Sequence, residues 1–128
     1  NGRPLDQDPQ FAARMAKVEI ALENMKTTNL RVIAAVAHGS VPGAERSMLK
    51  IRGTEIRQEI LSLIRRAMGP YALPFIEAAQ YEGYADAPVG PKEAATAAAN
   101  YFNYRKLSIF GGSNEIQKNI ISKMILGL

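Results

Sequence analysis

Apolar residues recur at spacings of three and four along much of the chain, which is the period of one face of an α-helix. The first such stretch predicts a helix from about Asp8 to Val36, with Pro9 in its first turn. Its apolar stripe consists of Phe11, Met15, Val18, Leu22, Met25, Val32, Ile33 and Val36. The sequence HGSVPG, residues 38–43, ends this helix, because glycine and proline interrupt regular helix.

A second helix is predicted from about Ala44 to Met68, and the sequence GPYALP, residues 69–74, ends it. Its predicted stripe consists of Leu49, Ile56, Ile60, Leu63, Ile64 and Ala67. Gly53 lies inside this helix, where glycine costs about 1 kcal/mol relative to alanine. Either the close approach of another helix or simple tolerance would explain it.

The remaining pattern predicts two more helices. Residues 75–89 are expected to form a loop or a short helix, and an alanine-rich helix follows from Pro91 through Phe110. Glycines 111 and 112 end it, and Ser113, a strong N-cap residue, begins the last helix. That helix carries an apolar stripe of Ile116, Ile120, Met124 and Leu128, widened by Ile121 and Ile125. The predicted fold is all-α, an antiparallel four-helix bundle formed by one domain over residues 1–128.

Composition excludes several kinds of chemistry. The chain has no cysteine and a single histidine, His38, so it has no disulfide, no thiolate nucleophile and no two-histidine metal site. We expect no metal site. No apolar run approaches the length of a membrane-spanning helix, and we expect no membrane partner. The absence of cysteine fits a reducing compartment, and we expect a cytoplasmic protein. Because the chain starts at Asn1 rather than methionine, a fragment of a longer polypeptide is one interpretation.

The net charge of +4 suits anionic ligands, but solvated helix faces explain it equally well. The basic residues of the second helix, such as Lys50 and Arg52, are mostly interpreted as solvated positions near Glu55. Aromatic and basic residues also alternate at Tyr101, Phe102, Tyr104, Arg105 and Lys106. Such a cluster can bind single-stranded nucleic acid, but core and interface positions on a bundle helix are the favoured interpretation.

The sequence GGSNE, residues 111–115, opens the last helix and is the strongest candidate binding site. Backbone N–H groups at the start of a helix bind anions, and glycines let a ligand approach the backbone closely. On these grounds alone, a double glycine before a helix is more often only the end of one helix and the start of the next.

Three stretches of the chain together resemble one family. IFGGSNEIQKNIISKMILGL, residues 109–128, is similar to the C-terminal signature of acyl-CoA dehydrogenases. SMLKIRGTE, residues 47–55, is similar to that family's Ser-Met-x-Lys stretch, and NGRPL, residues 1–5, resembles the end of a third family motif. The three matches fall in family order and span the whole chain.

The resemblance implies the C-terminal helical domain of a larger FAD-dependent enzyme, whose N-terminal helical and middle β domains are not in this chain. Such enzymes oxidise an acyl-CoA thioester to the 2,3-enoyl-CoA in fatty acid metabolism and usually pass the electrons to an electron-transfer flavoprotein. In the family this domain forms the oligomer core of a dimer or tetramer. The resemblance therefore implies an oligomer of identical or different subunits.

The resemblance also implies roles for individual residues. Gly112 falls where the family contacts the acyl-CoA, and Ser113, Asn114 and Glu115 fall on the part that contacts FAD. Gly111 falls where many members have the catalytic glutamate. Glycine cannot accept a proton, so no catalytic base is assigned in this chain. Two explanations of the missing base remain open. The catalytic base lies on an upstream helix, or this subunit is non-catalytic.

The end of the second helix falls on a family stretch that reaches the FAD of a neighbouring subunit. Gly69 matches that pattern, whereas Arg66 replaces a glutamine and Pro70 replaces a glycine. Arg66 is predicted to pair with a phosphate, because a guanidinium donates bidentately.

The isolated domain is predicted to bind FAD poorly, to lack dehydrogenase activity and to self-associate through exposed apolar surface. The alternative hypothesis is a non-catalytic helical interaction module that binds an acidic partner or nucleic acid. The resemblance favours the dehydrogenase, for which no nucleic-acid partner is expected.

Overall fold

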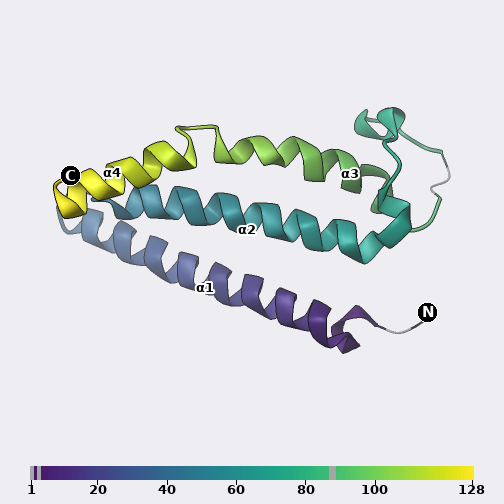
Figure 1. Cartoon of the computed structure of the whole chain (residues 1–128), viewed down its shortest axis with the longest axis horizontal. Helices are drawn as coiled ribbons and strands as arrows, with labels where there is room; N and C mark the ends of the chain where they lie inside the picture. Colours follow the sequence, from purple (N-terminus) through teal and green to yellow (C-terminus); the bar gives the residue numbers. More distant parts are fainter. Residues whose placement is uncertain (1, 3, 87–88) are drawn as a thin grey trace. The chain divides into compact units, whose positions relative to one another are not determined.

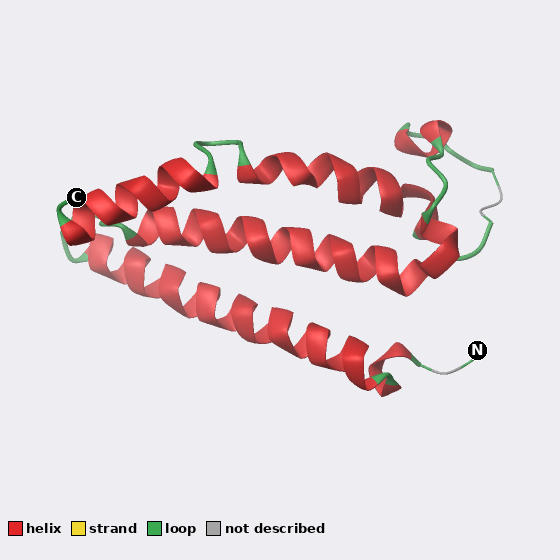
Figure 2. Cartoon of the chain, viewed as in Figure 1, coloured by secondary structure: helices red, strands yellow, loops and turns green. Residues whose placement is uncertain are grey.

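The computed structural model describes residue 2, residues 4–86 and residues 89–128. Four α-helices follow in order (Figure 1), and they are α1 Pro9–Ala37, α2 Glu45–Met68, α3 Ala94–Asn103 and α4 Asn114–Leu126. The short 3-10 helices are η1 Leu5–Gln7, η2 Gly69–Ala72, η3 Glu77–Gln80 and η4 Tyr104–Ser108. The described part of the chain contains helices and loops but no strand (Figure 2). The predicted all-α fold class with four α-helices is confirmed.

The chain divides into two compact units. The first unit is Asn1–Met15 and Gln58–Arg105, and the second unit is Ala16–Arg57 and Lys106–Leu128. Helices α1 and α2 each contribute one part to each unit.

The core of the first unit is built on alanine. Four alanines of α3 are buried, namely Ala94, Ala95, Ala97 and Ala98. Their small side chains let α3 pack against η2 and η3, where Ala72 is only 1% exposed. Leu61 and Leu63 of α2 are also buried in this unit. The alanine-rich segment is therefore closely packed.

The second unit is organised around the first part of α2. Its buried residues are Val18, Ala44, Ser47, Ile51, Thr54 and Ile56. Gly53 faces α1, where an added Cβ would lie 3.5 Å from Met25 Sδ, an ordinary van der Waals distance. No backbone approaches that position within 4 Å, so simple tolerance explains this glycine better than a close helix crossing.

The third helix is shorter than the sequence predicted. We expected helix through Phe110, but α3 ends at Asn103 and η4 follows. The Tyr104 N–H donates to both Asn100 and Phe102 carbonyls, so the last turn tightens. The side chain and carbonyl of Arg105, the next residue, bond to Gln58 of α2.

The apolar stripes differ in how much of them the chain covers. On α2, buried Ile51 and Leu61 were missing from the predicted stripe, and Ile64, which was included, is 39% exposed. Only Val18 is buried on α1, and no residue of α4 is buried. The exposed large side chains of these two helices are Met15, Ile20, Leu22, Leu30, Ile33, Val36, Ile116, Ile120, Met124, Ile125 and Leu126. Much apolar surface of α1 and α4 is therefore exposed in the described part of the chain.

Candidate functional site

The start of α4, residues 111–117, is called here the α4 corner and lies in the second unit. Gly111 and Gly112 turn the chain with φ of 63° and 83°, in the left-handed region that favours glycine. Ser113 then adopts extended backbone, and its Oγ accepts a hydrogen bond from Ile116 N at 3.4 Å. The prediction that Ser113 caps the last helix is confirmed.

Gln117 holds the glycine turn from inside the helix. Its Nε2 donates to the Gly111 carbonyl at 3.0 Å. An added Cβ on Gly112 would lie 2.8 Å from that same nitrogen, so a side chain there would have to displace it. Sequence reasoning assigned no role to Gln117, although it ends the Glu-Ile-Gln run of the resembling stretch.

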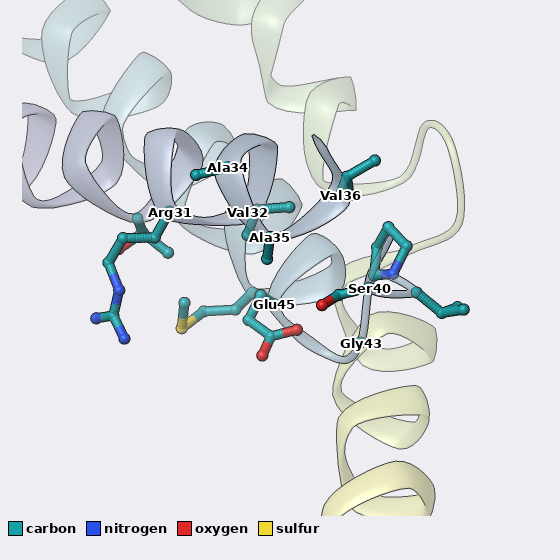
Figure 3. Close-up of a pocket in the computed structure, with 12 residues that line it drawn as sticks. Arg31, Val32, Ala34, Ala35, Val36, Ser40, Gly43 and Glu45 are labelled. Carbon is teal, nitrogen blue, oxygen red and sulfur yellow. The ribbon is translucent and has the colours of Figure 1, made fainter. Parts of the chain in front are cut away.

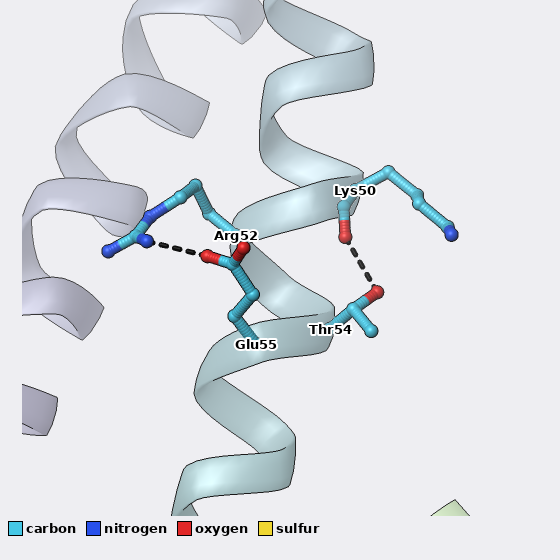
Figure 4. A network of polar contacts seen from close by, with 4 residues as sticks. All are labelled: Lys50, Arg52, Thr54 and Glu55. Atoms are coloured by element: carbon cyan, nitrogen blue, oxygen red, sulfur yellow. Dashed lines mark hydrogen bonds and ion pairs between the residues drawn. The ribbon is translucent and has the colours of Figure 1, made fainter. Parts of the chain in front are cut away.

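Lys50 connects two of the stretches that resemble the family. Its Nζ donates to Asn114 Oδ1 at 2.9 Å in a partly buried contact. Figure 4 shows Lys50 and Thr54 on one side of α2, while Arg52 and Glu55 pair at 2.6 Å on the other. The interpretation as a solvated charge fits Arg52 but is wrong for Lys50.

Glu115 is exposed in the first turn of α4. A hydrogen bond from its own backbone N–H lowers the pKa of its carboxyl below 4.5, and the Ser113 hydroxyl, Lys118 and Lys50 add to this effect. A lowered pKa makes the carboxylate a poorer proton acceptor. Glu115 therefore suits the helix N-terminus better than the role of catalytic base.

Gly111 occupies open space. It is exposed, and no heavy atom lies within 4 Å of the position that its Cβ would occupy. Among the described residues, none places a carboxylate within 4 Å of that point.

Arg66 and Gly69 lie together at the end of α2, in the first unit. Arg66 is exposed, and its Nε donates to Ser62 Oγ at 3.5 Å. Gly69 is exposed with φ of 55°, and Pro70 after it has no N–H to donate. These predicted cofactor residues and the α4 corner belong to different units.

The aromatic and basic residues near the end of α3 contact one another. Arg105 Cζ lies 4.4 Å from the centroid of the Tyr101 ring, and Arg65 Cζ lies 4.9 Å from it. Gln58 accepts from the Arg105 guanidinium through Oε1 at 3.2 Å and through its carbonyl at 3.4 Å. We call Gln58, Arg65, Tyr101 and Arg105 the Tyr101 cluster. These contacts favour a structural role over stacking on nucleic-acid bases.

A pocket of about 650 Å³ opens in the second unit, between the end of α1 and the start of α2 (Figure 3). Apolar side chains such as Val32, Val36 and Met48 line much of it, with Arg31 and Glu45 as its charged residues. None of the predicted cofactor or substrate residues lines this pocket. The sequence marked residues 38–43 only as a helix break, so the pocket was not anticipated.

The described residues offer neither a metal site nor a membrane-spanning helix. Within the described ranges, no three histidine or carboxylate side chains gather closely enough to hold a metal ion. Among the helices described, none combines the length and apolar character needed to cross a membrane.

The family resemblance extends beyond the α4 corner. Two residues of the NGRPL stretch, Asn1 and Arg3, lie outside the described residues. No curated protein and no solved structure is significantly similar to the chain. Residues 1–126, nearly the whole chain, match the family described as acyl-CoA dehydrogenase, C-terminal domain. The chain therefore belongs to the acyl-CoA dehydrogenase C-terminal domain family.

Proposed function

We propose that this chain is the C-terminal helical domain of a larger FAD-dependent acyl-CoA dehydrogenase. In that enzyme it contributes contacts to FAD and surface to the oligomer core. The observation that carries the proposal is the α4 corner, where a capped helix of 13 residues begins directly after two glycines with positive φ. Family membership over residues 1–126 supports the same assignment.

The residues of the α4 corner fit a nucleotide cofactor. First-turn N–H groups and the positive end of the helix dipole attract phosphate oxygens. Ser113, Asn114 and Glu115 would contact FAD, and Gly112 would lie against the acyl-CoA. When bound, FAD supplies the acceptor for the hydride from the β-carbon of the thioester. This chain contributes binding and orientation to that reaction.

The proton of the α-carbon must go to a carboxylate outside this domain. Gly111 has no side chain to accept it, and the lowered pKa of Glu115 makes that group a poor base. The base therefore lies on a segment upstream of this chain, or this subunit is the non-catalytic member of a mixed oligomer. If the full-length protein turns over acyl-CoA without another subunit type, the base lies on the upstream segment.

The exposed apolar faces of α1 and α4 support the oligomeric part of the proposal. Ile20, Leu30 and Ile33 of α1 are each more than half exposed, as are Ile116, Met124 and Ile125 of α4. Exposed apolar side chains in this number favour an interface with another subunit or domain. We propose a dimer or tetramer of identical or different subunits. We also propose an electron-transfer flavoprotein as electron acceptor and a cytoplasmic location.

The test compares the full-length protein with the isolated domain. The full-length protein is expected to purify with flavin absorbance that an acyl-CoA bleaches under anaerobic conditions. The 128-residue domain, mixed with FAD, is expected to bind it poorly, to turn over no acyl-CoA and to self-associate in sedimentation experiments. A full-length protein that is colourless and takes up no added FAD would refute the assignment.

Arg66 is a separate part of the proposal, because it lies in the first unit and not at the α4 corner. Its exposed guanidinium is proposed to pair with a phosphate of FAD bound to a neighbouring subunit. Arg66→Ala in the full-length protein should weaken FAD binding, whereas Arg52→Ala, which removes another exposed arginine of α2, should not. Equal FAD affinity of Arg66→Ala and the parent protein would remove this role.

A further inference from the structure

We infer that Lys50 is a positioning residue that fixes the orientation of the Asn114 side-chain amide at the α4 corner. The observation is the partly buried hydrogen bond of 2.9 Å from Lys50 Nζ to Asn114 Oδ1. The two residues lie 64 positions apart in the sequence, on α2 and on the first turn of α4. The inference rests on the proposed function, since Asn114 is one of the proposed FAD contacts.

The chemistry of the two groups determines the orientation. The oxygen and nitrogen of an asparagine amide are hard to distinguish by shape, and their assignment depends on hydrogen-bond partners. An ammonium group has donors only, so the oxygen of Asn114 must face Lys50. The two N–H bonds of Asn114 Nδ2 then remain as the donors of this side chain. Asn114 therefore presents hydrogen-bond donors to a cofactor whose nearby group is an acceptor oxygen.

Lys50 is not simply one of several cations around the corner. Both Lys50 and Lys118 lower the pKa of the Glu115 carboxyl, and Lys118 has the larger effect of the two. Only the contact of Lys50 with Asn114 would orient the amide. Lys118 is exposed on α4 and thus supplies a matched control for the loss of one positive charge.

The first experiment measures the dissociation constant of FAD in the full-length apoprotein by fluorescence titration. Lys50→Met keeps the apolar stem and removes the donor, and FAD affinity should fall about tenfold, as for loss of a hydrogen bond to a charged group. Lys118→Met should change it less than about twofold, since an exposed charge is screened. Lys50→Arg should recover part of the loss. Equal losses in Lys50→Met and Lys118→Met would overturn the inference.

A double-mutant cycle tests whether Lys50 acts through Asn114. In an Asn114→Ala background, Lys50→Met should cause no further loss of FAD affinity. A further tenfold loss would mean that Lys50 contacts the cofactor itself, and would overturn the positioning role. Asn114→Asp keeps the Lys50 contact but removes the donors, so it should weaken FAD binding without lowering the melting temperature. Unchanged FAD affinity of Asn114→Asp would also overturn the inference.

The same cycle, read by thermal unfolding without cofactor, separates this inference from the proposed function. If the parent protein binds no FAD, the proposed function fails. If the melting temperatures of Lys50→Met and Asn114→Ala are simply additive, the contact does not exist in solution and the inference fails by itself. Coupled melting temperatures, together with the FAD cycle, support it.

Discussion

The α4 corner of the second unit and the Tyr101 cluster of the first use polar side chains of the same helix, α2, in opposite ways. In the Tyr101 cluster, two guanidiniums lie against one ring, and Gln58 bonds to Arg105 through both its side chain and its carbonyl. These groups contact one another, although Arg65 Nε is buried and has no hydrogen-bond partner among the described residues. At the α4 corner, Lys50 and Gln117 each hold one point of the loop, while Gly111 between the helices stays exposed.

The difference separates a cluster of side chains that contact one another from the proposed binding site. Side chains of the Tyr101 cluster bond to one another, and we expect their removal to cost stability and little else. At the α4 corner the side chains fix backbone and amide donors without covering them, so their removal should cost ligand binding as well. Substitutions at four positions, with matched controls, test what each region contributes to stability. Unfolding is compared at one protein concentration because self-association would shift it.

The largest effect on stability is expected in the Tyr101 cluster. Tyr101→Ala removes the ring that faces Arg65 and Arg105, and we expect it to lower the free energy of unfolding by about 3 kcal/mol. Tyr101→Phe keeps the ring and should change it by less than about 1 kcal/mol. Urea unfolding followed by circular dichroism measures both. Similar losses in the two variants would show that the hydroxyl, and not the ring, matters.

The next effect concerns the glycine turn of the α4 corner. Gly112→Ala places a side chain at φ of 83° and displaces Gln117 Nε2, which should cost about 2 kcal/mol of unfolding free energy. Gly53→Ala adds the same methyl group inside α2, at an ordinary van der Waals distance of 3.5 Å from Met25 Sδ, and should stabilise by up to about 1 kcal/mol. Urea unfolding of the two variants should therefore show opposite signs. A neutral Gly112→Ala would mean that the turn is not held in this conformation.

Removal of the helix cap should have a smaller effect. Ser113→Ala removes the oxygen that accepts from Ile116 N, and about 1 kcal/mol of unfolding free energy should be lost. Ser113→Asp keeps an acceptor at the same position and should retain most of the stability. If both variants unfold like the parent, the serine does not cap the helix in solution.

The smallest effect is a pH dependence. The folded state lowers the pKa of Glu115 below 4.5, so this group favours folding above that value, and its contribution disappears as the pH falls through the folded pKa. Glu115→Gln should therefore reduce stability at neutral pH slightly and leave the acid limit unchanged. Urea midpoints measured from about pH 6 to about pH 3 test the sign. If Glu115→Gln lost more stability relative to the parent at about pH 3 than at about pH 6, the predicted sign would be wrong.

Much of the fold follows from local rules that the sequence displays. The boundaries of α1 and α2 were predicted to within one residue, because proline, glycine and the period of apolar residues act over one or two turns of helix. Ser113 was identified as a cap for the same reason. The family was recognised from three short stretches, and the family model matches residues 1–126, nearly the whole chain.

The prediction failed where a residue's environment depends on another helix. Helix α3 ends at Asn103 rather than Phe110, in a tightened turn beside Arg105. Arg105 contacts Tyr101, which is near in the sequence, and Gln58, which is 47 residues away. The buried residues of α2 include Ile51 and Leu61, which the predicted stripe left out. Periodicity indicates that a helix has an apolar face, but not how wide that face is.

The sequence by itself determined that this chain is helical, where its two long helices begin and end, and which family it belongs to. Only the tertiary structure decided that Lys50 meets Asn114. Helix-forming signals act between near neighbours in the chain. A contact across 64 residues depends instead on the rotation and spacing of two packed helices, which are set by all the side chains between them.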